Sequence, residues 1–337
     1  MKTTLLAVAL CLGSMAAVDA APKEASRDTT ALKIVPGRLA IDRNGIAGIA
    51  LYESTGALDA QQASVRSAVV IVHGHLRNAH TYFESGLRAI ARSHKEGQVL
   101  LIAPQFPAQQ DVQRNALPAG TLRWTSQSWM AGDSALAPAA LSSFDVFDAI
   151  LDKLNDRSRF PNLKEIVIAG HSGGGQVVQR YAVLRHPPRA GEGDSVLVRF
   201  VVANPSSYAY FDAWRPEPVN SADCPAYNTW KYGLDDLPSY ASSKDASTLL
   251  RRYIQQDVTY LLGGNDTDPN HPALDKSCAA QAQGPFRLAR GLSYYSHLVK
   301  QQPDVINRQR LMIVPGVGHS ADGIFNSDAG QKALFGG

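Results

Sequence analysis

The sequence lacks the features that mark nucleic-acid-binding and membrane-spanning proteins. Its 337 residues contain no basic block, no internal repeat and no low-complexity tract, and 33 basic against 30 acidic residues leave a net charge of +3. We therefore expect no nucleic-acid partner, and nothing in the sequence points to an obligatory protein partner. Beyond the N-terminus no apolar run approaches the roughly 20 residues that span a bilayer, so integral membrane association is not expected either.

Cysteine is also scarce, and the first of the three cysteines lies in an unusual N-terminal segment. In this segment Lys2 precedes an apolar run over residues 5–12, and Val18-Asp19-Ala20 fits a small-x-small cleavage site. The pattern is typical of a secretory signal peptide. We expect residues 1–20 to be removed, leaving a mature protein of residues 21–337 that is secreted or periplasmic.

The other two cysteines, Cys224 and Cys278, remain in the mature chain. Two cysteines in an exported protein indicate one disulfide, although two free buried thiols are the alternative. The two positions are 54 residues apart in the sequence. An unstrained crosslink over that separation would stabilise the fold by roughly 3–4 kcal/mol.

The body of the chain alternates short apolar runs with amphipathic segments. A composition of 45% hydrophobic and 19% charged residues is that of a globular protein. Continuous apolar runs are typical of parallel strands covered on both faces, so we predict one α/β domain with a mostly parallel, doubly wound sheet and helices on both faces. Residues 37–52 could add an antiparallel edge. The predicted strands are 67–72, 98–103, 165–169, 198–203, 258–262 and 310–314, and the predicted helices are 82–93, 142–157, 173–186 and 286–300.

Two long stretches, residues 105–141 and 204–257, do not follow this alternation. Both come after the carboxyl ends of predicted strands, where open α/β sheets bind ligands. We expect them to form the walls and roof of a substrate pocket, with 204–257 as an insertion that could act as a cap. Aromatic residues there are candidates to line the pocket, or they simply pack the insertions together: Trp124, Trp129, Tyr208 and Trp214.

The strongest chemical signal is the sequence GHSGG at residues 170–174. It directly follows a predicted strand and opens a predicted helix, which is the setting in which a GxSxG motif lifts a nucleophilic serine out of a sheet. Small residues two before and two after Ser172 let the strand and helix pass closely. A dinucleotide-binding loop is a weak alternative, because it would need glycine at position 172.

A serine nucleophile needs a base and an orienting carboxylate. His319 follows the last predicted strand, and Asp266 follows the strand over 258–262. Asp268 is a competitor, but Asp266 comes first after the turn. The order serine, acid, histidine is that of α/β-hydrolases. Neighbouring residues only faintly resemble a calcium loop, since His271 stands where glycine is required, and we predict no metal.

An oxyanion hole needs two backbone N–H donors. Gly173, the residue after the nucleophile, is the first expected donor. The second should come from the loop after the strand over 67–72, and either His75 or Leu76 could supply it.

Together these motifs resemble the α/β-hydrolase superfamily from about residue 67 to residue 320. The matching strings are HG at 73–74, GHSGG at 170–174, GGND at 263–266 and PGVGH at 315–319. Longer strings, among them GHSGGGQVVQRYA, are similar to poorly characterised exported bacterial and fungal hydrolases. His75-Leu76 replace two glycines of the HGGG form found in lipases and esterases, so substrate preference is not carried over from that subgroup.

The resemblance implies an α/β-hydrolase fold and two-step acyl transfer through a serine ester, with no cofactor. We expect an exported serine hydrolase that cleaves carboxylic ester bonds of a small-molecule or polymeric substrate. An amidase, peptidase or polyester depolymerase with the same triad is the alternative within the class. A catalytically silent, hydrolase-like binding protein is the alternative outside it.

Overall fold

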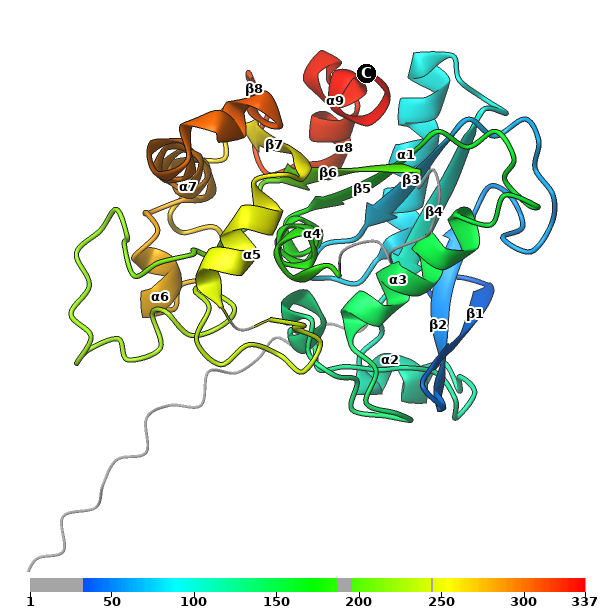
Figure 1. Ribbon diagram of the computed structural model, residues 1–337, viewed down its shortest axis with the longest axis horizontal. Coiled ribbons are helices and arrows are strands. Elements are labelled where there is room, and N and C mark those ends of the chain that lie inside the picture. Colours follow the sequence, from blue (N-terminus) through cyan, green and yellow to red (C-terminus); the bar gives the residue numbers. More distant parts are fainter. Residues whose placement is uncertain (1–32, 187–195, 244, 337) are drawn as a thin grey trace, which may run out of the picture.

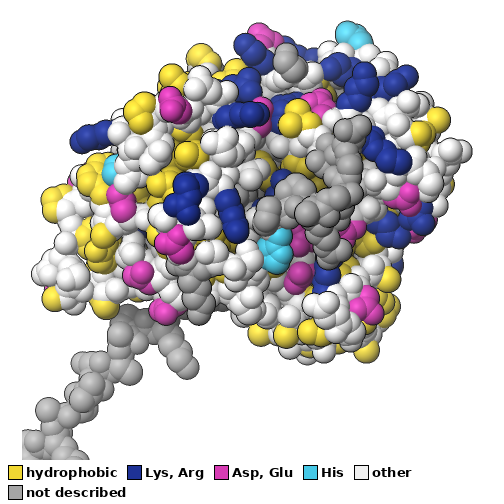
Figure 2. All heavy atoms as spheres, in the orientation of Figure 1, with side chains coloured by type: hydrophobic (Ala, Val, Ile, Leu, Met, Phe, Trp, Pro, Cys, Tyr) yellow, Lys and Arg dark blue, Asp and Glu magenta, His cyan; other side chains and the backbone are white. Residues whose placement is uncertain are grey.

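The computed structural model describes residues 33–186, 196–243 and 245–336. The predicted signal peptide over residues 1–20 lies outside the described residues. Within those three ranges, no helix is both long enough and apolar enough to cross a membrane. Basic and acidic side chains are interspersed over the face of the molecule that Figure 2 shows.

One eight-stranded sheet in the order β1-β2-β4-β3-β5-β6-β7-β8 runs through the molecule (Figure 1). β1 pairs with β2 and β2 with β4 in antiparallel fashion, and the other pairs are parallel. The predicted mostly parallel sheet with an antiparallel edge is confirmed. The strands are β1 Gly37–Arg43, β2 Ile46–Ser54, β3 Ser67–Val72, β4 Val99–Gln105, β5 Glu165–His171, β6 Leu197–Ala203, β7 Asp257–Gly263 and β8 Gln309–Val314.

Helices cover both faces of the sheet, as predicted (Figure 1). On one face lie α3 (Ser143–Leu154), α4 (Gly173–Leu184), α5 (Ala246–Tyr253) and α7 (Arg287–Gln301). On the other lie α1 (Ala79–Ser93), α8 (Ala321–Phe325) and α9 (Asp328–Phe335). The short elements α2 (Gln109–Arg114), η1 (Ser128–Ala131), α6 (Cys278–Gln281) and η2 (Pro303–Asn307) lie in the connections.

The central strands are apolar throughout because both faces of the sheet are buried. In β3, Val70 and Val72 pack into the core beneath α3 and α4, while Val69 and Ile71 pack into the core beneath α1. Successive side chains of a strand point to opposite faces, so a strand between two helical layers needs an unbroken apolar run. This is why the sequence pattern located these strands to within a few residues.

The insertion over residues 204–257 holds α5 as its one helix among its described residues. A disulfide joins Cys224 in the insertion to Cys278 at the start of α6, with the two Cα atoms 5.8 Å apart. The bond therefore ties the insertion to the segment that follows β7. Whether the insertion acts as a cap remains a prediction.

Candidate active site

Ser172 lies at the turn between β5 and α4, in the middle of the sheet. Its backbone adopts φ 60° and ψ −119°, a conformation that L-residues rarely take and that is typical of a strained strand-to-helix turn. The backbone N–H of Ser172 donates to the carbonyl of Ala203, at 2.9 Å, at the end of the neighbouring β6. The turn thereby presents the serine hydroxyl at the carboxyl edge of the sheet.

A histidine contacts this hydroxyl, and an aspartate contacts the other ring nitrogen of that histidine. The Nε2 atom of His319 lies 3.0 Å from the Oγ of Ser172, and its Nδ1 lies 2.7 Å from an Oδ of Asp266. His319 follows β8, and Asp266 follows β7. The competing Asp268 is exposed and accepts a hydrogen bond from the backbone of Asn270 instead. The geometry therefore favours Asp266 over Asp268 as the partner of the imidazole.

The electrostatics of this series suit a histidine that accepts a proton. Burial lowers the pKa of His319, although its hydrogen bond to Asp266 acts in the opposite direction. Burial alone would raise the pKa of Asp266, but the hydrogen bond from His319 and the charge of Arg287 outweigh it and hold that pKa below its usual value. The carboxylate is therefore ionised at neutral pH, and it fixes the His319 proton on Nδ1 so that Nε2 faces the serine.

The backbone N of His75 lies close to Gly173, the residue that follows Ser172. A Cβ atom built on Gly173 would lie 3.1 Å from the backbone N of His75 and 2.7 Å from the Sδ of Met130. The amide of His75 is thus the one placed next to Gly173, which favours it over Leu76 as the second oxyanion donor. The side chain of Leu76 is half exposed.

Asn204 joins the loops that carry the acid and the base, and sequence reasoning missed it. Its Oδ1 accepts the backbone N–H of Gly263 at 2.7 Å, and its Nδ2 donates to the carbonyl of Gly318 at 3.3 Å. Asn204 is buried and has a φ of 42°. Asparagine tolerates this left-handed conformation better than most residues, so an asparagine directly after a strand was the available signal.

Arg287 was also missed as a site residue. It is the first residue of α7, it is completely buried, and its Nη1 lies 3.3 Å from the second carboxylate oxygen of Asp266. A buried arginine is rare without a charged partner. No local pattern indicates this burial, because the arginine and the aspartate lie 21 residues apart on different elements.

The predicted pocket aromatics do not share one location. Trp124 and Trp129 are buried to 1% and 0% exposure in the core around Phe106, and Tyr208 is buried and stacked on Tyr294. These placements fit packing of the insertions, and a substrate-lining role is not supported for the three. Trp214 is 42% exposed and stacks on a histidine of α7 at the surface.

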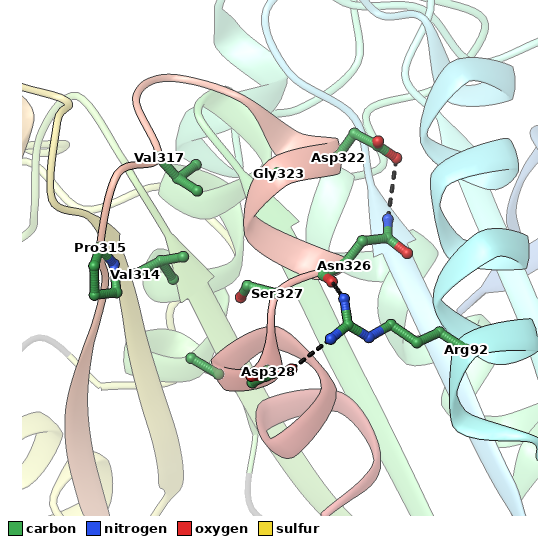
Figure 3. Close-up of a pocket in the computed structure, with 10 residues that line it drawn as sticks. Arg92, Val314, Pro315, Val317, Asp322, Gly323, Asn326, Ser327 and Asp328 are labelled. Atoms are coloured by element: carbon green, nitrogen blue, oxygen red, sulfur yellow. Dashed lines mark hydrogen bonds and ion pairs between the residues drawn. The ribbon is translucent and has the colours of Figure 1, made fainter.

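A pocket of about 500 Å³ is lined by the end of β8, the residues that follow it, and parts of α1, α8 and α9 (Figure 3). Arg92 of α1 reaches across it to the backbone carbonyl of Asn326 and to the carboxylate of Asp328, while Asn326 donates to Asp322 at 3.0 Å. The two contacts of Arg92 join α1 to the end of α8 and to the start of α9. The lining residues are Arg92, Val314, Pro315, Val317, Asp322, Gly323, Asn326, Ser327, Asp328 and Ala329.

Metal ligands are not grouped in the described part of the chain. There, no cluster of three or more histidine, cysteine, aspartate or glutamate side chains is arranged to hold a metal ion.

The chemistry that the arrangement around Ser172 can perform is nucleophilic attack by an activated hydroxyl, with two amides to stabilise a developing oxyanion.

Comparisons with known proteins place the chain among α/β-hydrolases. The model of the Alpha/beta hydrolase family matches residues 69–329. Poly(aspartic acid) hydrolase-1 from Sphingomonas sp. KT-1 is similar in structure with a TM-score of 0.59 and 25% identity, covering 90% of this chain and 100% of that one. LpqC, a poly(3-hydroxybutyrate) depolymerase from Bordetella parapertussis, has a TM-score of 0.56 and 22% identity, covering 85% of each chain. No curated protein matches the chain.

Proposed function

Because the chain belongs to the α/β-hydrolase family, we propose that it is an exported serine hydrolase that cleaves carboxylic ester bonds. One observation carries the proposal: Asp266, His319 and Ser172 form an unbroken hydrogen-bonded series at distances of 2.7 and 3.0 Å. The N-terminal signal pattern and the disulfide support export.

In the proposed reaction, His319 Nε2 takes the proton of the Ser172 hydroxyl as its oxygen attacks the carbonyl carbon of the ester. The resulting oxyanion accepts hydrogen bonds from the amides of Gly173 and His75. His319 then gives its proton to the departing alkoxide, which leaves an acyl group on Ser172. A water molecule deprotonated by His319 attacks this acyl-enzyme and releases the acid, and His319 returns the proton to Ser172.

A second candidate is hydrolysis of polymer backbone bonds, either amide or ester. The similarity to poly(aspartic acid) hydrolase-1 extends over all of that chain at 25% identity, and this favours a polymeric amide as the alternative substrate. The same serine, base and oxyanion donors would act on an amide, with His319 protonating the leaving amine.

The test compares the mature protein with Ser172→Ala on p-nitrophenyl esters from acetate to long acyl chains. Ser158→Ala, an exposed serine at a distance from the site, is the matched control. We expect turnover by the mature protein and the control and none by Ser172→Ala, and the chain-length profile measures the acyl pocket.

A parallel assay with poly(aspartic acid) and a polyester separates the candidates. Turnover of the polyamide without turnover of any ester would replace the ester proposal by the amide one. If a folded protein turned over no substrate and its Ser172 did not react with a fluorophosphonate, the catalytically silent binding protein would be the better description.

A further inference from the structure

Arg287 links three groups around the candidate acid and base. Its Nη1 donates to Asp266 Oδ1 at 3.3 Å, its Nε to the Oγ of Ser206 at 3.1 Å, and its Nη2 lies 3.4 Å from the Nδ1 of His271. Asp266 thus uses one carboxylate oxygen for Arg287 and the other for His319. A carboxylate held at both oxygens cannot rotate away from the imidazole without breaking a charge-assisted hydrogen bond.

The surroundings of His271 fix its tautomer. Its Nδ1 receives the backbone N–H of Ala273 at 3.1 Å as well as the guanidinium of Arg287, and neither donor can accept a proton. Nδ1 must therefore present a lone pair, so the ring is neutral with its proton on Nε2. Burial and then the charge of Arg287 lower the pKa of His271, in agreement with this arrangement.

His271 also contacts the base directly. Its ring meets the ring of His319 edge to face, with centroids 4.9 Å apart. Asp266, His319, His271 and Arg287 therefore form a closed circuit in which every neighbouring pair is in contact. A displacement of either His271 or Arg287 would disturb the acid and the base together.

We propose that Arg287 and His271 are a positioning pair. The pair holds Asp266 and His319 in the orientation that catalysis needs, and it sets the acidic limit of the pH–rate profile. The inference rests on the proposed function, since it assigns a role for that reaction. Neither residue is expected to touch the substrate carbonyl. The pair acts through the orientation and the charge of Asp266 and His319.

The sign of the pH effect follows from the charges around the base. The positive charge of Arg287 offsets the negative charge of Asp266, so the carboxylate stabilises a protonated His319 less than it would alone. Burial, to which the neutral ring of His271 contributes, and the charge of Arg287 both lower the pKa of His319. His171, whose ring is 4.5 Å away, and Asp268 and Lys276, which act on His271, complete the set of titratable neighbours.

Since the reaction needs an unprotonated base, a lower pKa extends activity to lower pH. The acidic limb of kcat/KM for the wild type should fall below the ordinary histidine pKa of about 6.5. Arg287→Gln should reduce kcat/KM by at least about tenfold and shift the acidic limb of the profile to higher pH by about one pH unit. Arg287→Lys keeps the charge but cannot contact Ser206, Asp266 and His271 at once, so kcat should fall while the limb stays near that of the wild type.

His271→Asn should move the limb upward by a smaller amount than Arg287→Gln does. Arg88→Gln, which removes an arginine paired at the surface with Asp322, is the matched control and should leave the profile unchanged. Lower activity at every pH with an unmoved limb in both Arg287→Gln and His271→Asn would overturn the proposal. If Arg287→Gln does not fold, His271→Asn alone decides it on the same criterion.

A measurement that needs no turnover separates this inference from the proposed function. The pKa of His319 is read by NMR titration of histidine-labelled protein in the Ser172→Ala background, with and without Arg287→Gln. An upward shift without Arg287 supports the pair even if no ester is hydrolysed, in which case only the proposed function fails. Ester hydrolysis together with an unchanged pKa of His319 would overturn the role assigned to Arg287 and His271 and would still agree with the proposed function.

Discussion

Gly170 and Gly174 approach each other so closely that a Cβ atom on Gly170 would lie 2.2 Å from the carbonyl oxygen of Gly174. The obstructing atoms belong to the backbone, so they cannot move aside as a side chain can. The close approach of β5 to α4 is what allows the turn at Ser172 to be so sharp. The glycine two positions before the serine therefore serves the geometry of the site.

Gly170→Ala should accordingly destabilise the protein by about 3 kcal/mol or more, because forced overpacking against rigid backbone is costly. Chemical denaturation with urea measures the loss. Gly120→Ala is the matched control, since its new Cβ would meet only the flexible tip of Ile49, at 3.2 Å. Equal stability of the two variants would show that the backbone at the β5–α4 crossing can shift to accept a methyl group, which would contradict the prediction.

Replacing Asp266 and Asp268 in turn identifies the acid. Asp266→Asn should lower kcat/KM by roughly 10³- to 10⁴-fold, because an amide cannot hold the productive tautomer of His319 or stabilise its protonated form. Asp268→Asn should leave kcat/KM nearly unchanged, because its side chain accepts from the backbone of Asn270 and His319 bonds to Asp266 instead. A melting curve of each variant checks folding, since Asp266→Asn also leaves Arg287 buried without its countercharge. Comparable losses in both variants would contradict the assignment.

Asn204 should matter for both stability and activity. Asn204→Ala removes the acceptor for Gly263 and the donor to Gly318, and the free energy of unfolding should fall by about 1–3 kcal/mol as buried partners are left unpaired. Because those partners flank Asp266 and His319 in the chain, kcat should fall as well. Asn204→Asp retains the acceptor for Gly263, but it buries a carboxylate and turns an oxygen toward the carbonyl of Gly318, so it should be destabilised as well. Loss of stability with full kcat would mean that Asn204 supports the fold alone.

The Cys224–Cys278 bond should contribute roughly 3–4 kcal/mol to stability. A Cys224→Ser, Cys278→Ser protein should unfold at lower denaturant concentration than the oxidised wild type, and a reductant should have no further effect on it. Because the bond anchors the insertion to the segment after the acid loop, we also expect a lower kcat/KM. Unchanged kcat/KM would limit the bond to a stabilising role.

The sequence predicted the sheet, and it predicted that the three central residues of the candidate site lie close together, because both have local signatures. Ser172 stands in a strand–turn–helix pattern, and Asp266 and His319 each follow an apolar run closely. The carboxyl ends of parallel strands meet at one edge, so separate local patterns were enough to bring the three together.

Contacts that depend on packing between distant segments could not be predicted from the sequence. Trp124 and Trp129 lie in a long connection, and only the folded structure reveals that this connection packs into the core. Arg287 looks like an ordinary charged residue at the start of a helix, yet it is completely buried against Asp266. Burial of this kind depends on how distant segments meet, and no local pattern records it.

The place of each strand in the sheet has a consequence for how activity would be lost on heating or in mild denaturant. Ser172 leaves β5, which has strands on both sides, whereas His319 follows β8, the last strand in the order, which among the described strands pairs only with β7. An edge strand can detach while the rest of the sheet stays intact. Activity should then disappear before the main unfolding transition, and it should return promptly when the edge re-forms, so inactivation would measure the fraying of one strand and not the melting of the molecule.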